Sequence, residues 1–316
     1  MSNYHIKHLE EYFQVYRKSV INPELFWSEI AEEHFVWRKK WDQVLQWDFE
    51  KPEISWFKNA KLNITENCID RHLQIRGNKT AIIFEPNDPK ESTLHISYTE
   101  LHKRVCKFAN VLKDQGVQKG DRVCLYLPMI PELAVAVLAC ARIGAVHSVI
   151  FAGFSATALA TRIQDCEAKL VITSDGSYRG SKIIPLKQIV DDALSSCKTV
   201  TSVLVVKRVD IDIELKPKRD QWLQPLLDKA SDECLVEILD AEDPLFILYT
   251  SGSTGKPKGM LHTTAGYMVY TAFTFKKCIS IYRERRILVH RRHRLDHRAF
   301  LYCIWPFVKR SNDSHV

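Results

Sequence analysis

The sequence predicts an α/β fold in which helices cover a largely parallel β-sheet. Two patterns carry this prediction. Short apolar runs typical of buried strands alternate with helical segments of about ten to fifteen residues, and glycine, proline or capping residues separate them. In such sheets, ligands bind at the carboxyl ends of the strands. The 316 residues, 46% hydrophobic and 26% charged, suffice for one large domain or two modest ones.

Residues 1–60 are rich in tryptophan and charge, and they lack a strand-rich core of their own. Within them, "NPELFWSEIAEEHF" predicts a helix, because Asn22 is a suitable N-cap and Pro23 suits the first helical position. We therefore expect a helical N-terminal extension that packs on the following domain.

Residues 61–276 carry the repeated strand–helix units. The helix in "HISYTELHKRVCKFANVLKDQG" is expected to have Thr99 as its N-cap and Gly116 as its stop. Pro131 opens the next helix, and Ser155 caps the one after it. The expected strands are the apolar runs 80–85, 121–128, 145–153, 168–176, 201–208 and 243–250, and a further helix is expected over 224–234.

The formal net charge of +7 is carried by residues 277–316, a basic tail with ten Lys or Arg against three Asp or Glu. The preceding 276 residues are therefore neutral overall. Such a tail would suit a nucleic-acid-binding arm or a helix on an anionic membrane. However, it shows no sustained periodicity, no helix caps and no glycine.

Nine cysteines are scattered without a C-x-x-C pair, which favours reduced thiols and a cytoplasmic protein. The N-terminus lacks the layout of a secretory signal. The apolar stretch 134–154 is divided by Arg142 and Gly144, so we expect a buried helix followed by a buried strand rather than a membrane span. Cys140, on that helix, is expected in the core.

The strongest functional signal is "YTSGSTGKPKG" (Tyr249–Gly259), which follows the apolar strand 245–249. Its glycines allow backbone N–H groups to turn toward an anion, its hydroxyls add donors, and its lysines add positive charge. An isolated motif of this kind would be a polar surface turn. Because these eleven residues act together after a buried strand, we predict a polyphosphate-binding loop.

This segment is not a P-loop of the G-x-x-x-x-G-K-[ST] kind. Gly252 and Gly255 are three residues apart, and Pro257 stands where a Mg²⁺-binding hydroxyl would follow Lys256. Pro257 also prevents a helix from continuing directly from the lysine. The anion would therefore be bound by a loop rather than by a helix N-terminus.

The same segment resembles the phosphate-loop signature of the adenylate-forming superfamily. The stretches "AEDPLFILYTSGSTGKPKGMLHTTAGYMVYTAFTFK", "ACARIGAVHSVIFAGFSATALATRI" and "NCIDRHL" are similar to the AMP-forming acetyl-CoA synthetases in particular. The similarity covers essentially all of residues 1–276. It implies an incomplete N-terminal large domain of parallel-sheet βαβ units, with the small C-terminal domain of the family absent.

The resemblance implies a ligase that joins acetate to ATP as an acetyl-adenylate, releases diphosphate, and transfers the acetyl group to CoA. ATP and CoA are then substrates, and catalysis of the first step rests on charge neutralisation and alignment. The residues that carry over as the loop for the β- and γ-phosphates are Thr250, Ser251, Gly252, Ser253, Thr254, Gly255, Lys256, Lys258 and Gly259.

A second stretch, "YRGSK" (Tyr178–Lys182), resembles the R-G-G-R segment that the family uses for the CoA nucleotide. Arg179 and Gly180 match that pattern, while Ser181 and Lys182 depart from it. Lysine keeps the charge but loses the bidentate fork of arginine, so CoA contact would be altered. Without the resemblance, a solvated turn after a strand would be the favoured interpretation.

The family's catalytic lysine and Mg²⁺-binding carboxylates have no counterpart in this sequence, although Mg²⁺ is expected in the intact enzyme. His262 lies close to the loop, but no carboxylate or nucleophile stands at a telling spacing, so we expect it to pack or to form hydrogen bonds. We expect the 316-residue chain to be inactive alone, to act on small molecules, and to bind neither nucleic acid nor membrane. Ligation of propionate or another short acid, and nucleic-acid binding through the tail, stay as alternatives.

The basic tail itself suggests out-of-frame translation. The family continues after "TFK" with a segment of different composition, and back-translating residues 289–316 one nucleotide forward permits that continuation. We therefore expect a frameshift near 276–278. Strands that the missing part would cover should leave apolar edges exposed.

Overall fold

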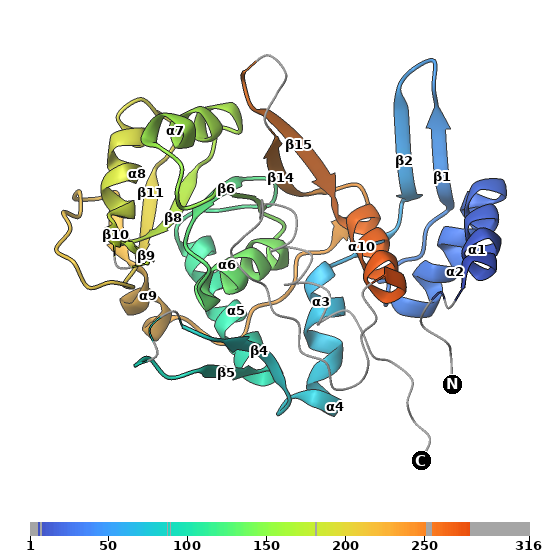
Figure 1. Cartoon of the computed structure of the whole chain (residues 1–316), viewed down its shortest axis with the longest axis horizontal. Helices are drawn as coiled ribbons and strands as arrows, with labels where there is room; N and C mark the ends of the chain where they lie inside the picture. Colours follow the sequence, from blue (N-terminus) through green and yellow to red (C-terminus); the bar gives the residue numbers. More distant parts are fainter. Residues whose placement is uncertain are drawn as a thin grey trace.

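The computed structural model describes residues 6, 8–86, 88, 90–180, 182–250 and 255–278. The central strands are β6 (Arg122–Tyr126), β7 (Val146–Val149), β8 (Leu170–Ser174), β11 (Ser202–Val206), β12 (Asp220–Trp222), β14 (Pro244–Thr250) and β15 (Lys258–Thr263). They form one seven-stranded sheet of order β12-β11-β8-β6-β7-β14-β15 (Figure 1). Every pair from β12 to β14 is parallel, which confirms the predicted α/β fold.

The edge strand β15 is the exception, because it pairs antiparallel with β14. The sequence does not predict this strand: its exposed residues lack the apolar run of the buried strands. An antiparallel strand needs only a short connection, whereas a parallel one needs a crossover. Thr250 and Lys258, which flank the centre of the glycine-rich segment, therefore face each other across this antiparallel pair.

Within the described residues, the faces of the sheet are covered mainly by α5 (Tyr98–Asp114), α6 (Pro131–Arg142), α7 (Ala156–Asp165) and α8 (Leu186–Leu194). Alternate residues of β6 point to opposite faces, as a strand requires. Val123 and Leu125 belong to the core that α5 and α6 complete, whereas Cys124 and Tyr126 belong to the core that α7 and α8 complete. Both faces of the sheet are thus buried, which explains the continuous apolar runs in its strands.

Three of the predicted helix starts are confirmed. Asn22 caps α2 (Pro23–His34) through its side-chain oxygen, which accepts from the N–H of Leu25 at 3.1 Å. Ser155 caps α7 in the same way, and Pro131 occupies the first turn of α6. These signals are local, so the sequence suffices to place them.

Two helix boundaries differ from the prediction. Ser97, not Thr99, caps α5, because Ser97 is still extended at the end of a strand and its hydroxyl accepts from the N–H of Glu100. The helix near 224–234 is shorter than expected: α9 (Leu223–Lys229) ends where Ala230 turns extended. The predicted stop at Gly116 agrees with its left-handed φ of 79°, just past the end of α5.

The N-terminal segment consists of α1 (Leu9–Ile21), α2 and the hairpin of β1 (Gln43–Asp48) and β2 (Glu53–Lys58). The sequence analysis predicts helix here but not this hairpin. Figure 1 places these elements beside α10 (Thr264–Cys278). The rings of Phe26 and Trp27 lie 5.4 and 5.5 Å from that of Phe273, so aromatic contacts join the extension to the end of the described chain.

The remaining elements are short. They are β3 (Lys61–Leu62), α3 (Ile64–Cys68), η1 (Asp70–His72), α4 (Leu73–Arg76), β4 (Thr80–Phe84), β5 (Leu94–Ser97), β9 (Ser177–Arg179), β10 (Lys182–Ile184) and β13 (Leu239–Asp240). The apolar stretch 134–154 forms α6 and β7, as expected, and Gly144 makes the turn between them with a φ of 71°. In the part of the chain that the structure describes, every helix is too short or too polar to span a bilayer.

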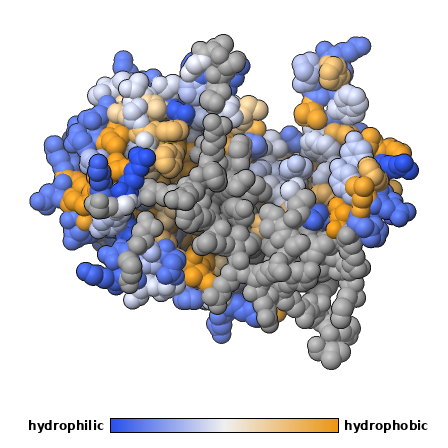
Figure 2. Space-filling view, viewed as in Figure 1, coloured by the Kyte–Doolittle hydropathy of each residue, from blue (hydrophilic) through white to orange (hydrophobic). Residues whose placement is uncertain are grey.

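Apolar side chains also reach the surface. Figure 2 shows such patches over the N-terminal elements, at the right of the view. None of the residues of α1 is buried, and Phe13 and Val20 of that helix are 49% and 60% exposed. On the edge strand β15, Met260 and Leu261 are 51% and 55% exposed. Among the described residues, β15 is therefore an edge strand with exposed apolar side chains, as expected.

Candidate functional site

The topology brings both predicted binding segments to the same end of the sheet, where the parallel strands have their carboxyl ends. The glycine-rich segment follows the carboxyl end of β14, and the hairpin of β9 and β10 follows the carboxyl end of β8. Because β14 and β8 are parallel and separated by β6 and β7, their ends lie three strand spacings apart, about 14 Å. Parallel sheets bind ligands at these carboxyl ends.

The described residues of the glycine-rich segment after Tyr249 are exposed, except for Pro257, which is half-buried. Thr250 ends β14, Lys256 is 73% exposed, and Lys258 and Gly259 begin β15. Gly255 has a left-handed φ of 83°, which suits glycine alone at low cost. Ser251, Gly252, Ser253 and Thr254, which belong to the predicted loop, lie outside the described residues.

The hairpin stem is tight at Gly259. A Cβ there would lie 3.1 Å from Cγ2 of Ile247 and 3.2 Å from the ring of Tyr249, so a side chain would have to displace a buried neighbour. No helix follows Lys256 directly, in agreement with the constraint from Pro257. The polar loop is thus carried by a rigid strand pair.

Tyr249 fixes the base of the loop to α7. Its hydroxyl donates to Oδ2 of Asp165 at 2.8 Å, and its ring lies 5.6 Å from the guanidinium carbon of Arg162. Burial raises the pKa of Tyr249, and the hydrogen bond to Asp165 raises it further, so the phenol keeps its proton as a donor. Lys256, within the predicted loop, places its Nζ 3.8 Å from Oδ1 of the same carboxylate.

The predicted CoA segment is the tip of the β9–β10 hairpin. Arg179 pairs with Lys182 in the strand register, and both side chains are exposed. Gly180 turns the chain with a φ of 62°. Ser181 lies outside the described residues. Two cations therefore stand at the tip of the hairpin, as phosphate binding requires.

Arg208 holds this hairpin from the side. Its guanidinium carbon lies 5.3 Å from the ring centre of Tyr178, and it makes two hydrogen bonds, of 2.8 and 3.1 Å, to the carboxylate of Glu91. An arginine that is stacked and bidentate has little freedom to move. The sequence analysis does not identify Arg208, because its partners are 30 and 117 residues away in the chain.

Asp175 is a second residue that sequence reasoning missed. Its buried carboxylate accepts hydrogen bonds from the backbone N–H groups of Gly176, Arg208, Val209 and Asp210, at 2.7 to 3.2 Å. It thereby fixes the chain just past β8, from which the β9–β10 hairpin starts. The signal in the sequence is an aspartate before a glycine at a strand end, which is typical of many turns.

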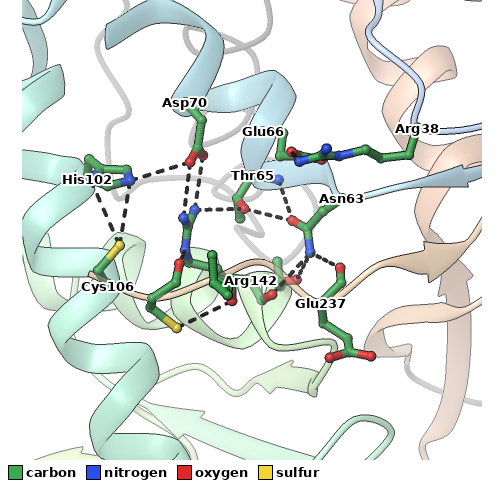
Figure 3. Close-up of polar contacts among 12 residues, drawn as sticks. Arg38, Asn63, Thr65, Glu66, Asp70, His102, Cys106, Arg142 and Glu237 are labelled. Carbon is green, nitrogen blue, oxygen red and sulfur yellow. Dashed lines mark hydrogen bonds and ion pairs between the residues drawn. The ribbon is translucent and has the colours of Figure 1, made fainter. Parts of the chain in front are cut away.

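A cluster of polar side chains at the C-terminal end of α6 joins that helix to α5 and η1 (Figure 3). Arg142 donates to both carboxylate oxygens of Asp70 at 3.0 Å and to the carbonyl of Cys234 at 2.8 Å. Nε2 of His102 lies 3.4 Å from Asp70, and the hydrogen bond to that carboxylate raises the pKa of His102 to about 9. Asn63 donates to three backbone carbonyls in the same cluster.

This cluster has no catalytic arrangement. Sγ of Cys106 lies 3.6 Å from Nε2 of His102, which is also the nitrogen nearest Asp70, so the imidazole cannot pass a proton from the thiol on one nitrogen to the carboxylate on the other. Cys106 is, moreover, fully buried. The cluster therefore stabilises the fold.

Two single residues behave as the sequence suggests. His262 stacks on Phe246 with ring centres 4.4 Å apart, which fits a packing role. Cys140 is fully buried in the core, and burial raises the pKa of its thiol. On the other side of Phe246, His147 is also stacked, and burial lowers its pKa to about 3. Within the described residues, no three His, Cys, Asp or Glu side chains gather as metal ligands would.

Comparisons with known proteins identify the family of this chain. Residues 69–310 match the sequence model of the AMP-binding enzymes, and residues 12–68 match that of the acetyl-coenzyme A synthetase N-terminus. An acetyl-coenzyme A synthetase 2 from Pseudomonas aeruginosa is 54% identical over 267 residues, which are 84% of this chain and 41% of that protein. An acetyl-coenzyme A synthetase from Magnetococcus marinus is 54% identical over 265 residues, with the same coverage.

Among solved structures, an acetoacetyl-CoA synthetase from Streptomyces lividans matches with a TM-score of 0.74 at 28% identity, over 82% of this chain and 39% of that one. This chain thus spans about two fifths of the length of the relatives that it matches. The resemblance drawn from the sequence motifs is confirmed: the chain belongs to the AMP-binding enzyme family, is similar to acetyl-coenzyme A synthetases, and corresponds to an N-terminal part of those proteins.

Proposed function

We propose that this chain is the N-terminal part of an AMP-forming acetate–CoA ligase. The observation that carries the proposal is the 54% identity to acetyl-coenzyme A synthetases over 84% of the chain. The reaction would join acetate to ATP as an acetyl-adenylate, release diphosphate, and transfer the acetyl group to the thiol of CoA. The identity of the relatives supports acetate over propionate, and it supports a ligase over a nucleic-acid-binding protein.

In this proposal, the segment from Thr250 to Gly259 binds the β- and γ-phosphates of ATP. Lys256 and Lys258 would neutralise charge as the acetate carboxylate approaches the polyanion, which is the main electrostatic obstacle of that step. Mg²⁺ would add to this neutralisation in an intact enzyme, through ligands supplied by other parts of the family fold. The location of the segment at the carboxyl edge of the sheet supports this assignment.

Arg179, Gly180, Ser181 and Lys182 would bind a phosphate of the CoA nucleotide. The two cations at the hairpin tip support this role, and the ~14 Å between strand ends leaves room for separate nucleotide and CoA sites. Since Lys182 stands where the family pattern has arginine, we expect a contact that is less directional than a bidentate one.

Titration of the 316-residue chain with ATP by calorimetry tests the phosphate assignment. The pair Lys256→Gln with Lys258→Gln should weaken binding by about tenfold or more, because two charge-assisted contacts are removed. The matched control is Lys18→Gln with Lys40→Gln, which removes the same charge from the N-terminal extension. Equal ATP affinity for both double variants would contradict the proposed site.

A second assay concerns the whole reaction. We expect the 316-residue polypeptide alone to form no acetyl-CoA from acetate, ATP and CoA, because it spans only about two fifths of the relatives. Formation of acetyl-CoA, measured by mass spectrometry, would show that this length suffices. A full-length relative such as the Pseudomonas aeruginosa protein provides the positive control.

A further inference from the structure

Both sides of the glycine-rich segment meet one carboxylate. Tyr249, directly before the segment, donates its hydroxyl to Oδ2 of Asp165 at 2.8 Å. Lys256, within it, places Nζ 3.8 Å from Oδ1. Asp165 belongs to α7, more than 80 residues earlier in the chain, so this convergence exists only in the folded protein.

The two contacts differ in strength. Tyr249 is buried, with 8% of its surface exposed, and its ring packs in the core that α7 and α8 complete. Its hydroxyl donates at 2.8 Å to a charged acceptor, so this hydrogen bond is the stronger of the two contacts. Lys256 is 73% exposed and its separation from Asp165 exceeds a hydrogen-bond distance, so this pair is weak and readily exchanged.

The strong contact of Tyr249 and the weak contact of Lys256 with the same carboxylate suggest two different roles. The Tyr249 contact fixes where the loop leaves the sheet, whatever is bound. The Lys256 contact lasts only until a stronger anion arrives, since a phosphate group carries more charge than a carboxylate. When Lys256 leaves, Asp165 still accepts from Tyr249 and is open to solvent, so the exchange costs the carboxylate little.

We propose that Asp165 is a positioning residue for phosphate binding: it anchors the loop through Tyr249 and holds Lys256 by an ion pair that incoming polyphosphate must displace. This inference rests on the proposed function, because it assumes that the glycine-rich segment binds polyphosphate. It predicts that the negative charge of Asp165 opposes phosphate binding while its hydrogen bond to Tyr249 supports it.

Two substitutions separate these effects. Asp165→Asn removes the charge but keeps an oxygen that accepts from Tyr249, so the affinity for inorganic tripolyphosphate should rise by about two- to fivefold, the range expected of an exposed ion pair. Tyr249→Phe removes the anchor and keeps the charge, so the affinity should fall. If Asp165 had a purely structural role, both variants should change the affinity for tripolyphosphate in the same direction.

The experiment is a double-mutant cycle on the full 316-residue chain, with tripolyphosphate binding measured by calorimetry at fixed salt. Asp165→Asn should tighten binding in the parent chain but not in the Lys256→Gln background. The contributions of other basic residues to the binding free energy cancel in the cycle, because all four chains share these residues. Glu167→Gln is the matched control: it removes a nearby, 71% exposed charge that pairs with Arg122 instead.

The outcomes are distinct. Tightening by Asp165→Asn that persists without Lys256, or that Glu167→Gln reproduces, would overturn the inference in favour of a general charge effect. Weaker binding by Asp165→Asn would also overturn it. If Lys256→Gln leaves tripolyphosphate binding unchanged, then the proposed phosphate site is itself wrong, which is a different failure.

Discussion

Arg142 and Asp70 form a bidentate ion pair that ties the end of α6 to η1, with both hydrogen bonds at 3.0 Å (Figure 3). The Arg142 side chain is 5% exposed. Burial acts to raise the pKa of Asp70, but the hydrogen bonds from His102 and Arg142 outweigh it, and the pKa is lowered. The carboxylate therefore stays charged and receives two cations.

Removing Arg142 should destabilise the protein strongly. Arg142→Ala leaves Asp70 partly buried with one partner fewer and leaves the carbonyl of Cys234 without this donor, so we expect a loss of about 3 kcal/mol in the free energy of unfolding. Urea denaturation followed by tryptophan fluorescence measures this loss. Arg104→Ala, which breaks a half-exposed pair with Glu100 on one helix, is the control and should cost about 0.5 kcal/mol or less. Similar losses for both variants would contradict the ranking.

His102 should make stability depend on pH in the alkaline range. Its hydrogen bond to Asp70 raises its pKa from 6.5 to about 9, so its protonated form is favoured by folding. The resulting stabilisation is fully present below pH 6.5 and is lost as the pH rises through about 9. His102→Gln should remove this loss, on the order of 2 kcal/mol between pH 6 and pH 9.5. Unfolding curves at both pH values test this expectation. If the free energy of unfolding of His102→Gln differs between the two pH values as much as that of the parent chain, the pH dependence does not come from His102.

The Asp175 carboxylate should be essential for the stability of the chain segment that follows β8. Asp175→Ala leaves several buried N–H groups without an acceptor, so we expect a loss of about 3 kcal/mol or more. Hydrogen exchange should show faster exchange at the amides of Val209 and Asp210 than in the parent chain. Asp210→Asn, whose own side chain is 78% exposed, is the control and should change stability little.

The exposed edge of β15 should promote self-association. Leu261→Lys places a charge on this apolar edge strand, and it should reduce association without affecting the core. Sedimentation velocity compares the fraction of oligomer in the parent chain with that in the Leu261→Lys variant. Ile75→Lys introduces the same charge at a residue of α4 that is 79% exposed and away from the sheet edge. An equal reduction by both substitutions would indicate a net-charge effect rather than edge pairing.

The basic tail, residues 277–316, lies outside the described residues except for 277 and 278. We propose that it is translated out of frame, and the gene gives a direct test: the frame one nucleotide forward after residue 276 should continue into coding sequence similar to acetyl-CoA synthetases. The AMP-binding match extends to residue 310 and so includes most of this tail. Only the nucleotide sequence separates a shifted frame from a divergent native one, and a stop or unrelated sequence in the shifted frame would refute the proposal.

The sequence by itself determined the features that depend on neighbouring residues. Apolar runs and helical spacing gave the parallel sheet, and local capping chemistry placed α2, α6 and α7. The glycines, hydroxyls and lysines of the segment before Gly259 pointed to phosphate chemistry, because each contributes through its own backbone or charge. The family resemblance came from the same contiguous stretches.

Only the tertiary structure decided which distant groups meet. The antiparallel pairing of β15, the convergence of Tyr249 and Lys256 on Asp165, and the ion pair of Arg142 with Asp70 all join segments that the fold brings together. Strand order and helix placement set these contacts, and no local periodicity encodes them. Carboxylates such as Asp165 and Asp70 look in the sequence like ordinary surface charges, and their roles follow from the partners that folding supplies.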